Sequence, residues 1–226
     1  MEQIRVEELF DLTHSLAATM LRMKQYPWEA LGEISEFIIS LGATLSEDEF
    51  EQRGENIWVA RDAKIAPSAY LSGPLIIGHK TEVRHCAYIR GSALVGDGAV
   101  IGNSTELKNC ILFDRAQVPH FNYVGDSILG YRAHMGAGSI TSNVRSDNKN
   151  IIVHSASGPV ETGRRKFGVM LGDFVEVGCN SVLNPGTVIG RNSIIYPTSC
   201  VRGVVPEASI YKNSGVIIAR KMEDKA

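Results

Sequence analysis

An aliphatic residue recurs at every sixth position through a long tract in the first half of this chain. The members of this series are Val59, Ile65, Leu71, Ile77, Val83, Ile89, Val95, Ile101 and Leu107. A helix has a period of about 3.6 residues and a strand a period of about 2, so neither repeats at six. A hexapeptide period is typical of a parallel β-helix, a solenoid whose coil has three short sides. We therefore expect coils of about eighteen residues with the aliphatic side chains pointing inward.

A second position of the repeat is also regular. The fourth residue after the aliphatic one is small at Ala63, Ala69, Thr81, Ala87, Ala93, Ala99 and Thr105. Small side chains suit the corners of a tight coil, where a bulky group would collide with the coils above and below. The repeat resumes between Leu171 and Val201, with Ser or Thr in the small position. Two positions that keep their phase across two tracts predict an all-β solenoid.

The composition argues against several classes of function. The 226 residues carry a formal net charge of -2 and no long charge run, so a nucleic-acid partner has no electrostatic support. No apolar stretch approaches the ~20 residues of a membrane span, and the N-terminus lacks the apolar region of a signal peptide. We therefore expect a cytoplasmic protein that binds neither nucleic acid nor membrane. Four cysteines without CxxC spacing are expected to be small fillers within the coils: Cys86, Cys110, Cys179 and Cys200.

The first fifty residues show helical rather than hexapeptide spacing. An apolar stripe with helical spacing covers residues 6–23. A second helix is expected to begin at Pro27, a residue favoured in the first turn, and to end at Gly42. This pair is too small to be a catalytic domain. It is expected to cap the open first coil, because an uncapped end exposes unpaired backbone, or to form a docking surface for another chain.

The repeat breaks in two places, and breaks in a regular scaffold are where function is expected. Near residue 112 the phase slips by one residue, and it slips again by Leu129. After Asn143 the pattern disappears until Leu171, and an excursion this long is uncommon unless it is functional or disordered. The expected organisation is a helical segment at 1–50, a β-helix over 57–212 with an excursion loop at about 144–168, and a tail at 213–226.

The residues between the two breaks carry a resemblance to a known family. They are His120-x-x-Tyr123-x-Gly125-Asp126, Gly136-Ala137-Gly138-Ser139-Ile140-Thr141-x-Asn143 and Asn148-Lys149, with Arg90-Gly91-Ser92-Ala93 and Glu106-Leu107-Lys108 upstream. This set resembles the acetyltransferase domain of the bifunctional N-acetylglucosamine-1-phosphate uridyltransferase/glucosamine-1-phosphate acetyltransferases. The excursion is most similar to that of the archaeal-type sugar-1-phosphate nucleotidylyltransferase/acetyltransferases. Over residues 57–205 the resemblance implies a left-handed parallel β-helix that forms homotrimers, with acetyl-CoA as co-substrate and no metal.

The resemblance implies a catalytic pair at the first break. N-acetylation needs a neutral amine to attack the thioester of acetyl-CoA, and histidine is the side chain best matched to removing a proton near pH 7. By its match to the family's catalytic histidine, His120 is the expected general base. The backbone N–H of Ala137 is the expected oxyanion donor. A tight coil corner explains the glycines around Ala137 without chemistry.

Further residues in family register are expected to bind the substrates. Basic side chains can neutralise and orient the dianion of a hexosamine 1-phosphate, and hydroxyl and carboxylate groups can contact its sugar. The acceptor set is Arg90, Glu106, Lys108, Tyr123, His134 and Lys149. The family often carries Asn at the position of His134, so this residue is a departure. The acetyl-CoA set is Asn143, the Cys179 main chain and Lys212, the last through an alignment with a gap. The basic cluster Arg164-Arg165-Lys166 either reaches a neighbouring subunit or is solvated.

The expected function is therefore transfer of an acetyl group from acetyl-CoA to glucosamine or galactosamine 1-phosphate in nucleotide-sugar biosynthesis. The family's nucleotidyltransferase domain has no counterpart here, which implies that a separate protein supplies that activity. Val144 also stands where the family usually has an aromatic residue. One alternative is a non-catalytic assembly or regulatory subunit on the same β-helix. A γ-type carbonic anhydrase needs two histidines five residues apart, a spacing that the six histidines never show.

Overall fold

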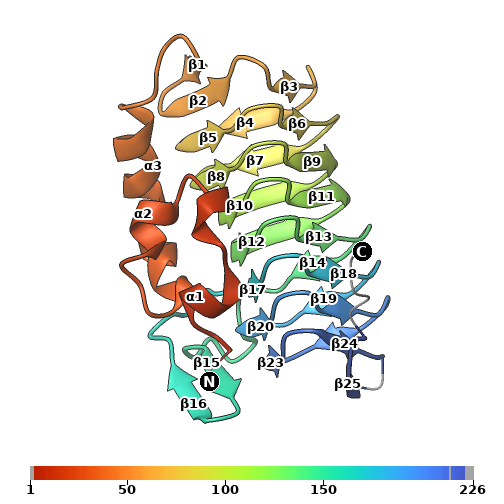
Figure 1. Cartoon of the computed structure of the whole chain (residues 1–226). Coiled ribbons are helices and arrows are strands. Elements are labelled where there is room, and N and C mark those ends of the chain that lie inside the picture. Colours follow the sequence, from red (N-terminus) through yellow and green to blue (C-terminus); the bar gives the residue numbers. More distant parts are fainter. Residues whose placement is uncertain (1–2, 214, 222–226) are drawn as a thin grey trace.

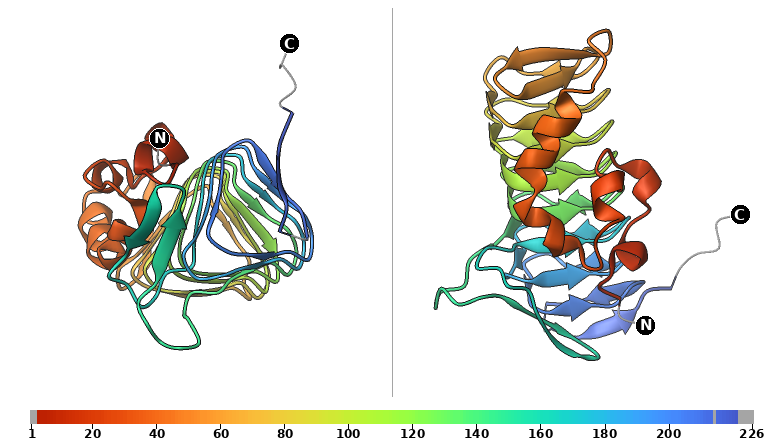
Figure 2. Two further views of the ribbon diagram at one scale, coloured as in Figure 1. Left: turned by 90° about the horizontal axis from the view of Figure 1, so that it is seen from below. Right: turned by 90° about the vertical axis from the view of Figure 1, so that its left-hand side faces the viewer.

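A solenoid of about nine turns dominates the computed structural model, which describes residues 3–213 and 215–221 (Figure 1). The all-β solenoid with a small N-terminal helical segment is thus confirmed. Strands of successive coils pair in parallel and stack into three flat faces, named here the first, second and third face. Figure 2 shows the triangular outline of the coils when the solenoid is viewed along its axis.

The strands are short, and each coil adds one to each face. The first face contains β2 (Ile57–Ala60), β5 (Leu75–Ile77), β8 (Ala93–Val95), β17 (Val169–Leu171), β20 (Thr187–Ile189) and β23 (Val204–Val205). The second contains β4 (Tyr70–Ser72), β7 (Tyr88–Arg90), β14 (Ile140–Thr141), β19 (Val182–Leu183) and β22 (Cys200–Val201). The third contains β3 (Lys64–Ile65), β6 (Glu82–Val83), β9 (Val100–Asn103), β11 (Gln117–His120), β13 (His134–Met135), β18 (Glu176–Val177), β21 (Ile194–Ile195) and β24 (Ser209–Tyr211).

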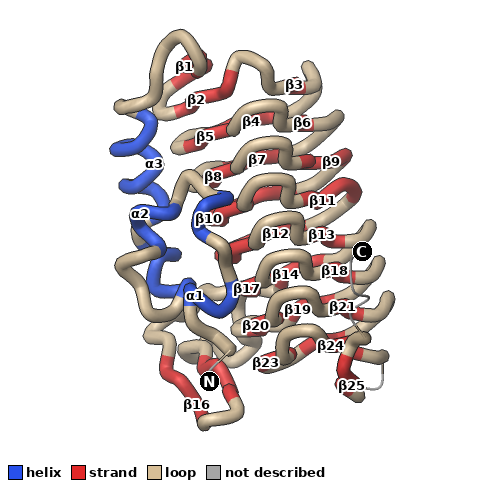
Figure 3. The backbone as a smooth tube through the Cα atoms, viewed as in Figure 1, coloured by secondary structure: helices blue, strands red, loops and turns tan. Residues whose placement is uncertain are grey.

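Two longer strands turn the corner between the second and the first face. They are β10 (Glu106–Leu112) and β12 (Tyr123–Leu129), which pair along their length. Antiparallel pairs lie at the two ends of the solenoid, where β1 (Phe50–Gly54) pairs with β2 and β25 (Ile217–Ala219) pairs with β24. A hairpin of β15 (Ile152–Ser155) and β16 (Gly158–Glu161) belongs to the excursion, and Figure 3 shows it projecting beside the lower coils.

The strand register explains the phase slips in the sequence. In the first coils the paired residues are 18 positions apart, as in the column that links Lys80 to Asp62. From the third coil the spacing falls to 17, as between Glu106 and Tyr123. Across the excursion it rises to 42, as between His134 and Glu176. Each predicted slip is therefore a coil of 17 residues, one residue shorter than the 18-residue coils that precede both slips.

The aliphatic series forms the core of the solenoid, as its period predicts. Its members are fully buried from Ile77 to Leu107, whereas Ile65 and Leu71 in the first coils are only partly buried. The small residues in the second regular position, such as Ala87 and Ala99, are also buried. At four of these positions the residue before the small one turns the corner in the left-handed region. Lys80, Cys86, Ser92 and Ser104 have φ between 51° and 58° there.

The N-terminal helices are shorter than their apolar stripe suggests. The stretch 6–23 is divided into α1 (Val6–Leu9), η1 (Leu12–His14) and α2 (Ala18–Leu21), followed by η2 (Pro27–Gly32) and α3 (Ile34–Gly42). The division arises because the backbone between the first helices bonds to the solenoid. The amide of Asp173 donates to the Leu9 carbonyl, and the Asp11 amide donates to the Asp173 carboxylate at 2.7 Å.

The two predicted boundaries of the second helical stretch are confirmed. Pro27 opens η2, a 3₁₀ helix, and Gly42 is the last residue of α3. The reason for the glycine differs from the one expected, because Gly42 is not in the left-handed region. A Cβ on Gly42 would lie 2.3 Å from the ring of Trp58, so a glycine is needed for the helix to approach the solenoid.

The helical segment lies along the first face of the solenoid, whereas the cap interpretation expects it across the open first coil (Figures 1 and 2). This face carries aliphatic residues outward as well as inward, so it needs an apolar cover. The outward residues buried under the segment include Ile76, Leu94, Ile111, Ile128, Met170 and Val188. They pack against a helical apolar set that includes Trp28, Leu31, Ile34 and Ile38.

The excursion folds back onto the same helical segment. It begins after Asn143, and a bridge between Val144 and Lys166 closes its base. The Phe167 ring stacks on Trp28 with 5.5 Å between the ring centroids. Within the described residues, no helix is both long enough and apolar enough to cross a membrane.

Candidate active site

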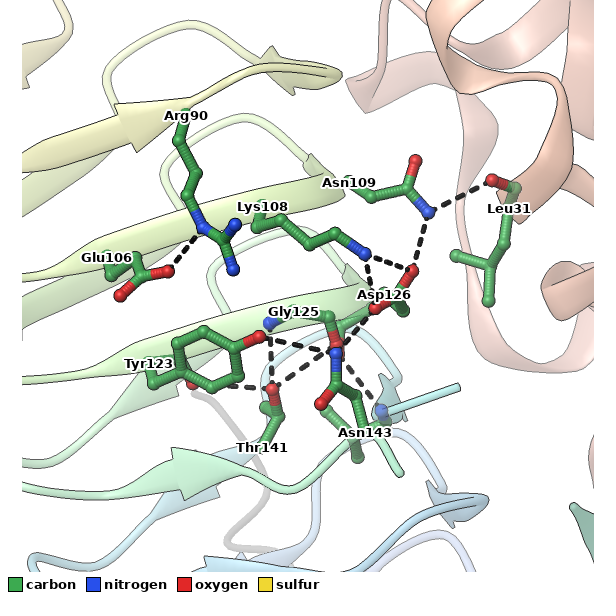
Figure 4. Close-up of polar contacts among 12 residues, drawn as sticks. Leu31, Arg90, Glu106, Lys108, Asn109, Tyr123, Gly125, Asp126, Thr141 and Asn143 are labelled. Carbon is green, nitrogen blue, oxygen red and sulfur yellow. Dashed lines mark hydrogen bonds and ion pairs between the residues drawn. The ribbon is translucent and has the colours of Figure 1, made fainter. Parts of the chain in front are cut away.

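Five predicted acceptor and donor residues gather on the second face, where four consecutive coils bring them side by side (Figure 4). They are Arg90 on β7, Glu106 and Lys108 on β10, Tyr123 on β12 and Asn143 after β14, and we call them the acceptor cluster. Parallel register produces this grouping. Glu106 pairs with Tyr123, and Lys108 pairs with Gly125 one coil further on.

Arg90 is ion-paired within the cluster. Its Nε lies 2.6 Å from Glu106 Oε1, and both side chains remain more than one-third exposed. The hydrogen bond that Arg90 donates to Glu106 raises the pKa of Arg90, so the guanidinium stays charged throughout the physiological range. The Nη groups of Arg90 point into the cluster in Figure 4. They remain donors for an anion, because a guanidinium carries five N–H groups.

Lys108 contacts a carboxylate that the sequence interpretation left out of the site. Its Nζ lies 3.0 and 2.9 Å from the two carboxylate oxygens of Asp126, whose side chain is only 5% exposed. Asn109 donates to the same carboxylate at 2.8 Å. Asn143 donates to it from the other side. Asp126 is therefore the shared acceptor around which the cluster is organised.

A sequence signal for this network does exist. Asn109, Asp126 and Asn143 are spaced 17 residues apart, which is the coil length in this part of the solenoid. Residues one coil apart occupy the same corner, so this spacing stacks the three side chains. The signal becomes visible only once the coil length after the phase slip is known.

Tyr123 lies over a glycine of its own strand. A Cβ on Gly125 would lie 2.4 Å from the Tyr123 hydroxyl, so the glycine makes room for the ring. Burial raises the pKa of the hydroxyl above its ordinary value of 10.0, and the phenol stays protonated at neutral pH. The hydroxyl accepts a hydrogen bond from Asn143 Nδ2 at 3.2 Å, and its own proton remains available for a further hydrogen bond.

The predicted base stands at the corner that leads into the acceptor cluster. His120 is the last residue of β11, and three residues later Tyr123 opens β12. Its side chain is exposed and makes no hydrogen bond or ion pair with any described residue. The buried Asn122 holds this corner, since its Oδ1 accepts from the His120 amide at 3.1 Å and its Nδ2 donates to the Gly136 carbonyl at 2.9 Å. The imidazole is thus on a fixed backbone with both nitrogens available.

The corner of His120 continues into the next two coils. The Gly138 amide donates to the His120 carbonyl at 3.0 Å, and the Asn180 amide donates to the Ala137 carbonyl at 2.9 Å. These bonds stack His120, Ala137 and the exposed Cys179 in one column. Across residues 3–213 and 215–221, the Ala137 N–H finds no hydrogen-bond acceptor. It is available to a carbonyl oxygen placed beside the column.

Three predicted site residues lie outside both groups. His134 is on the third face, where its Nδ1 lies 2.8 Å from Glu176 Oε2. Lys149 is exposed in the excursion, and its ammonium has no partner within the described part of the chain. Lys212 follows β24 and bonds through its backbone amide to the Val216 carbonyl. Among the described residues, no hydrogen bond or ion pair joins any of the three side chains to the acceptor cluster.

The basic run and the cysteines also have defined places. Arg164 is half-buried and donates through Nη2 to the Glu29 carbonyl at 2.7 Å, so it is committed to the helical segment of its own chain. The filler interpretation holds for Cys110, where burial raises the pKa of the thiol to about 12, and is wrong for the three exposed cysteines. No three His, Cys, Asp or Glu side chains converge as metal ligands in the described ranges.

The comparisons with known proteins agree with the architecture. The family model described as the GMPPB C-terminal domain matches residues 71–156. The bifunctional protein GlmU of Methanococcus maripaludis (strain C5) is 34% identical over 200 residues, covering 87% of this chain and 48% of the relative. A bifunctional sugar-1-phosphate nucleotidylyltransferase/acetyltransferase of Sulfurisphaera tokodaii is 30% identical over 190 residues, covering 82% of this chain and 47% of the relative. The chain thus spans about half the length of these curated relatives.

Among solved structures, PerB from Caulobacter crescentus in complex with CoA and GDP-perosamine matches with 18% identity and a TM-score of 0.39. The match covers 72% of this chain and 57% of PerB. The relationship to sugar-phosphate enzymes therefore rests on the sequence matches to the bifunctional proteins. These matches extend over both the acceptor cluster and the His120 column.

Proposed function

We propose that this chain, a hexapeptide-repeat β-helix that resembles the C-terminal part of GlmU, transfers the acetyl group of acetyl-CoA to the amine of a hexosamine 1-phosphate. One observation carries the proposal. The exposed imidazole of His120 has no partner in the described chain and stands three residues from a cluster that holds two cations, Arg90 and Lys108. A base beside a cluster that offers charged N–H donors fits an amine acceptor that also carries an anion.

In this mechanism His120 moves a proton between the two substrates. The amine nitrogen attacks the thioester carbonyl carbon, a C–N bond forms, and the carbon–sulfur bond then breaks. His120 takes the proton from the nitrogen and returns it to the sulfur of the departing CoA. The Ala137 N–H donates to the carbonyl oxygen while that oxygen carries negative charge. Atoms and charge balance without a metal or a redox step.

The phosphate of the acceptor is held by donors that the cluster leaves unused. Two of the three N–H groups of Lys108 point at Asp126, and one remains. Arg90 offers further N–H groups, because Glu106 accepts from Nε and Tyr123 engages only part of the remaining guanidinium. Lys149 adds a cation whose ammonium makes no ion pair within the described residues. The three together supply charged N–H donors that a sugar phosphate can use and a neutral sugar cannot.

The assembly is part of the proposal. Lys149, His134 and Lys212 are separated from the acceptor cluster within one chain. In a homotrimer with sites between neighbouring β-helices, these residues meet the cluster or the acetyl-CoA of an adjacent subunit. A nucleotidyltransferase activity would then convert the acetylated sugar phosphate to a nucleotide sugar.

The first experiment measures release of free CoA from acetyl-CoA with three acceptors: glucosamine 1-phosphate, galactosamine 1-phosphate and unphosphorylated glucosamine. We expect turnover with a phosphorylated acceptor and little with glucosamine. Turnover with glucosamine alone would refute the phosphate site. Complete inactivity of the folded protein with all three would refute the enzyme and favour a non-catalytic assembly or regulatory subunit.

A further inference from the structure

One corner of the solenoid carries a column of amide and carboxylate side chains. Asn109 and Asp126 occupy the same corner of successive coils, with φ of 49° and 47°. Asn and Asp are the residues with side chains that best tolerate this left-handed conformation. Asn143 continues the column one coil further. The corner geometry and the polar side chains therefore coincide at the edge of the acceptor cluster.

The column is joined by hydrogen bonds along its length (Figure 4). Asn109 Nδ2 donates to Asp126 Oδ1 at 2.8 Å, and Asn143 Nδ2 donates to Asp126 Oδ2. Lys108 Nζ donates to both oxygens of the same carboxylate. All four contacts meet on a side chain that is almost fully buried. The orientation of Asp126 consequently fixes where the Lys108 ammonium lies.

The column also reaches out of the solenoid to the helical segment. Asn109 Nδ2 donates its second hydrogen to the carbonyl oxygen of Leu31 in η2, at 3.1 Å. Both amide hydrogens of Asn109 are thereby used, one on η2 and one on Asp126. No other side chain of the acceptor cluster or its column bonds to the helical segment among the described residues.

The helix that receives this bond is itself held in place. Arg164 of the excursion donates to the Glu29 carbonyl, and its guanidinium packs against Gly32, where a Cβ would lie 3.0 Å from Nη1. Trp28 stacks on Phe167. Burial lowers the pKa of Arg164, although the carboxylates of Glu33 and Asp126 act in the opposite direction. The Leu31 carbonyl is therefore a fixed point rather than a free loop end.

We propose that Asn109 is a positioning residue that ties the acceptor cluster to the N-terminal helical segment, so that η2 determines where Lys108 meets the acceptor phosphate. The inference rests on the proposed function for the identity of the acceptor. It assigns the helical segment a role beyond covering the apolar first face. The segment becomes a structural part of the site through a single amide that bridges Leu31 and Asp126.

Asn109→Gly is the variant that tests this most cleanly. Glycine adopts a φ of 49° without strain, so the substitution removes the amide and leaves the corner intact. Asn192→Gly is the matched control, because Asn192 has a φ of 58° and its backbone carbonyl, not its side chain, accepts from Arg220. Both variants lose an asparagine at a left-handed corner, and only one loses the link to η2.

Binding of glucosamine 1-phosphate and galactosamine 1-phosphate is measured by calorimetry, and steady-state kinetics are measured beside it. For Asn109→Gly we expect Kd and KM for the phosphorylated acceptor to rise about tenfold, with kcat and the KM for unphosphorylated glucosamine nearly unchanged. Asn192→Gly should leave all of these constants unchanged. A lower melting temperature with unchanged Kd and KM would show a purely structural role and overturn the proposal.

Hydrogen–deuterium exchange supplies a readout that does not depend on activity. Added sugar phosphate should slow exchange over residues 27–32 in the wild type and in Asn192→Gly, and should fail to do so in Asn109→Gly. Equal protection in all three proteins would overturn the link. Binding without turnover in the wild type would refute acetyl transfer only. The ratio of the Kd of Asn109→Gly to the Kd of the wild type would still decide the role of Asn109. Absence of binding would refute both.

Discussion

The Lys108 ammonium lies between the two carboxylate oxygens of Asp126, 2.9 and 3.0 Å from them, beneath the surface of the second face. The charge that the sequence assigns to an acceptor phosphate is therefore already balanced inside the protein. A phosphate binding here joins an existing pair instead of filling a bare cationic site. Its affinity then depends on geometry and on the unpaired Lys149 as much as on net charge.

Asp126→Asn should cost much more stability than the neutralising substitution Glu106→Gln. It leaves Lys108 without its counter-ion. It also replaces one carboxylate oxygen by an NH2 group, which then faces the NH2 donor of Asn109 or of Asn143. Breaking a buried ion pair in this way costs about 3–5 kcal/mol of unfolding free energy. Glu106→Gln breaks the exposed pair with Arg90 and should cost about 0–1 kcal/mol. Urea denaturation compares the two, and equal losses would contradict the burial argument.

His120→Ala should lower kcat by about 10²–10⁴ and leave the affinity for acetyl-CoA nearly unchanged, because the general base acts only in the chemical step. Steady-state kinetics and calorimetry measure the two quantities. His85→Ala is the matched control, since His85 is also exposed and lies at the same corner of the solenoid, two coils away from His120. Asn103 lies between them: it pairs with His120 in the strand register and donates to the His85 carbonyl. Unchanged turnover in His120→Ala would remove this residue from the mechanism.

Lys149→Gln and Arg90→Gln should raise KM for a phosphorylated acceptor by about tenfold and barely affect unphosphorylated glucosamine. The reason is that both cations are expected to contact the phosphate alone. The exposed Lys80, on a distant corner, gives the control variant Lys80→Gln. If the substitutions at Lys149 and Arg90 affected both acceptors equally, their assignment to a phosphate site would be incorrect.

The pH dependence of stability should include a contribution from Asp114. Burial raises the pKa of its carboxyl above the ordinary 3.8, so the folded state retains the proton at pH values where the unfolded chain has lost it. The stability that the neutral carboxyl contributes is present below 3.8 and is lost as the pH rises through the raised folded value. Asp114→Asn should therefore show a smaller loss of unfolding free energy over this interval. Its amide oxygen can still accept from the Asp97 amide.

Chemical denaturation at several pH values provides the measurement for this carboxyl. Asp62→Asn is a suitable comparison, because the backbone hydrogen bond from Lys80 lowers the pKa of Asp62. The pH dependence of its contribution to stability has the opposite sign. That contribution is present above the ordinary carboxyl pKa and is lost as the pH falls. An identical pH slope in the wild type and Asp114→Asn would show that Asp114 titrates normally in the folded protein.

The solenoid was predictable because one regular feature determines it. A side chain that recurs every six residues must point the same way on each side of the coil, and the buried series from Ile77 to Leu107 does so. The phase slips were visible for the same reason, since a coil of 17 residues displaces every later member of the series. The position of the helical segment was harder to predict. Its signal is the outward aliphatic set, Ile76 and Ile111 among it, beside the inward ones.

The hydrogen bonds that join Asn109, Asp126 and Leu31 could not be predicted from the sequence, for a different physical reason. Asn109 and Leu31 are 78 residues apart in the chain, and their contact depends on where η2 docks rather than on any local pattern. The role of Asp126 has no local sequence signal, because the residues that bond to its carboxylate lie on neighbouring coils. The fragmentation of the first predicted helix has the same origin, since the Leu9 carbonyl and the Asp11 amide bond to Asp173 instead of continuing a helical ladder.

The placement of the helical segment also has a consequence for the order of assembly during synthesis. The Asp11 amide bonds to a carboxylate 162 residues further along the chain, and the outward cover of the first face extends to Val188. The helical segment leaves the ribosome before the coils do, so it has no complete surface to dock on until most of the coils have been made. Its apolar side chains therefore remain without their packing partners while the first face is synthesised coil by coil.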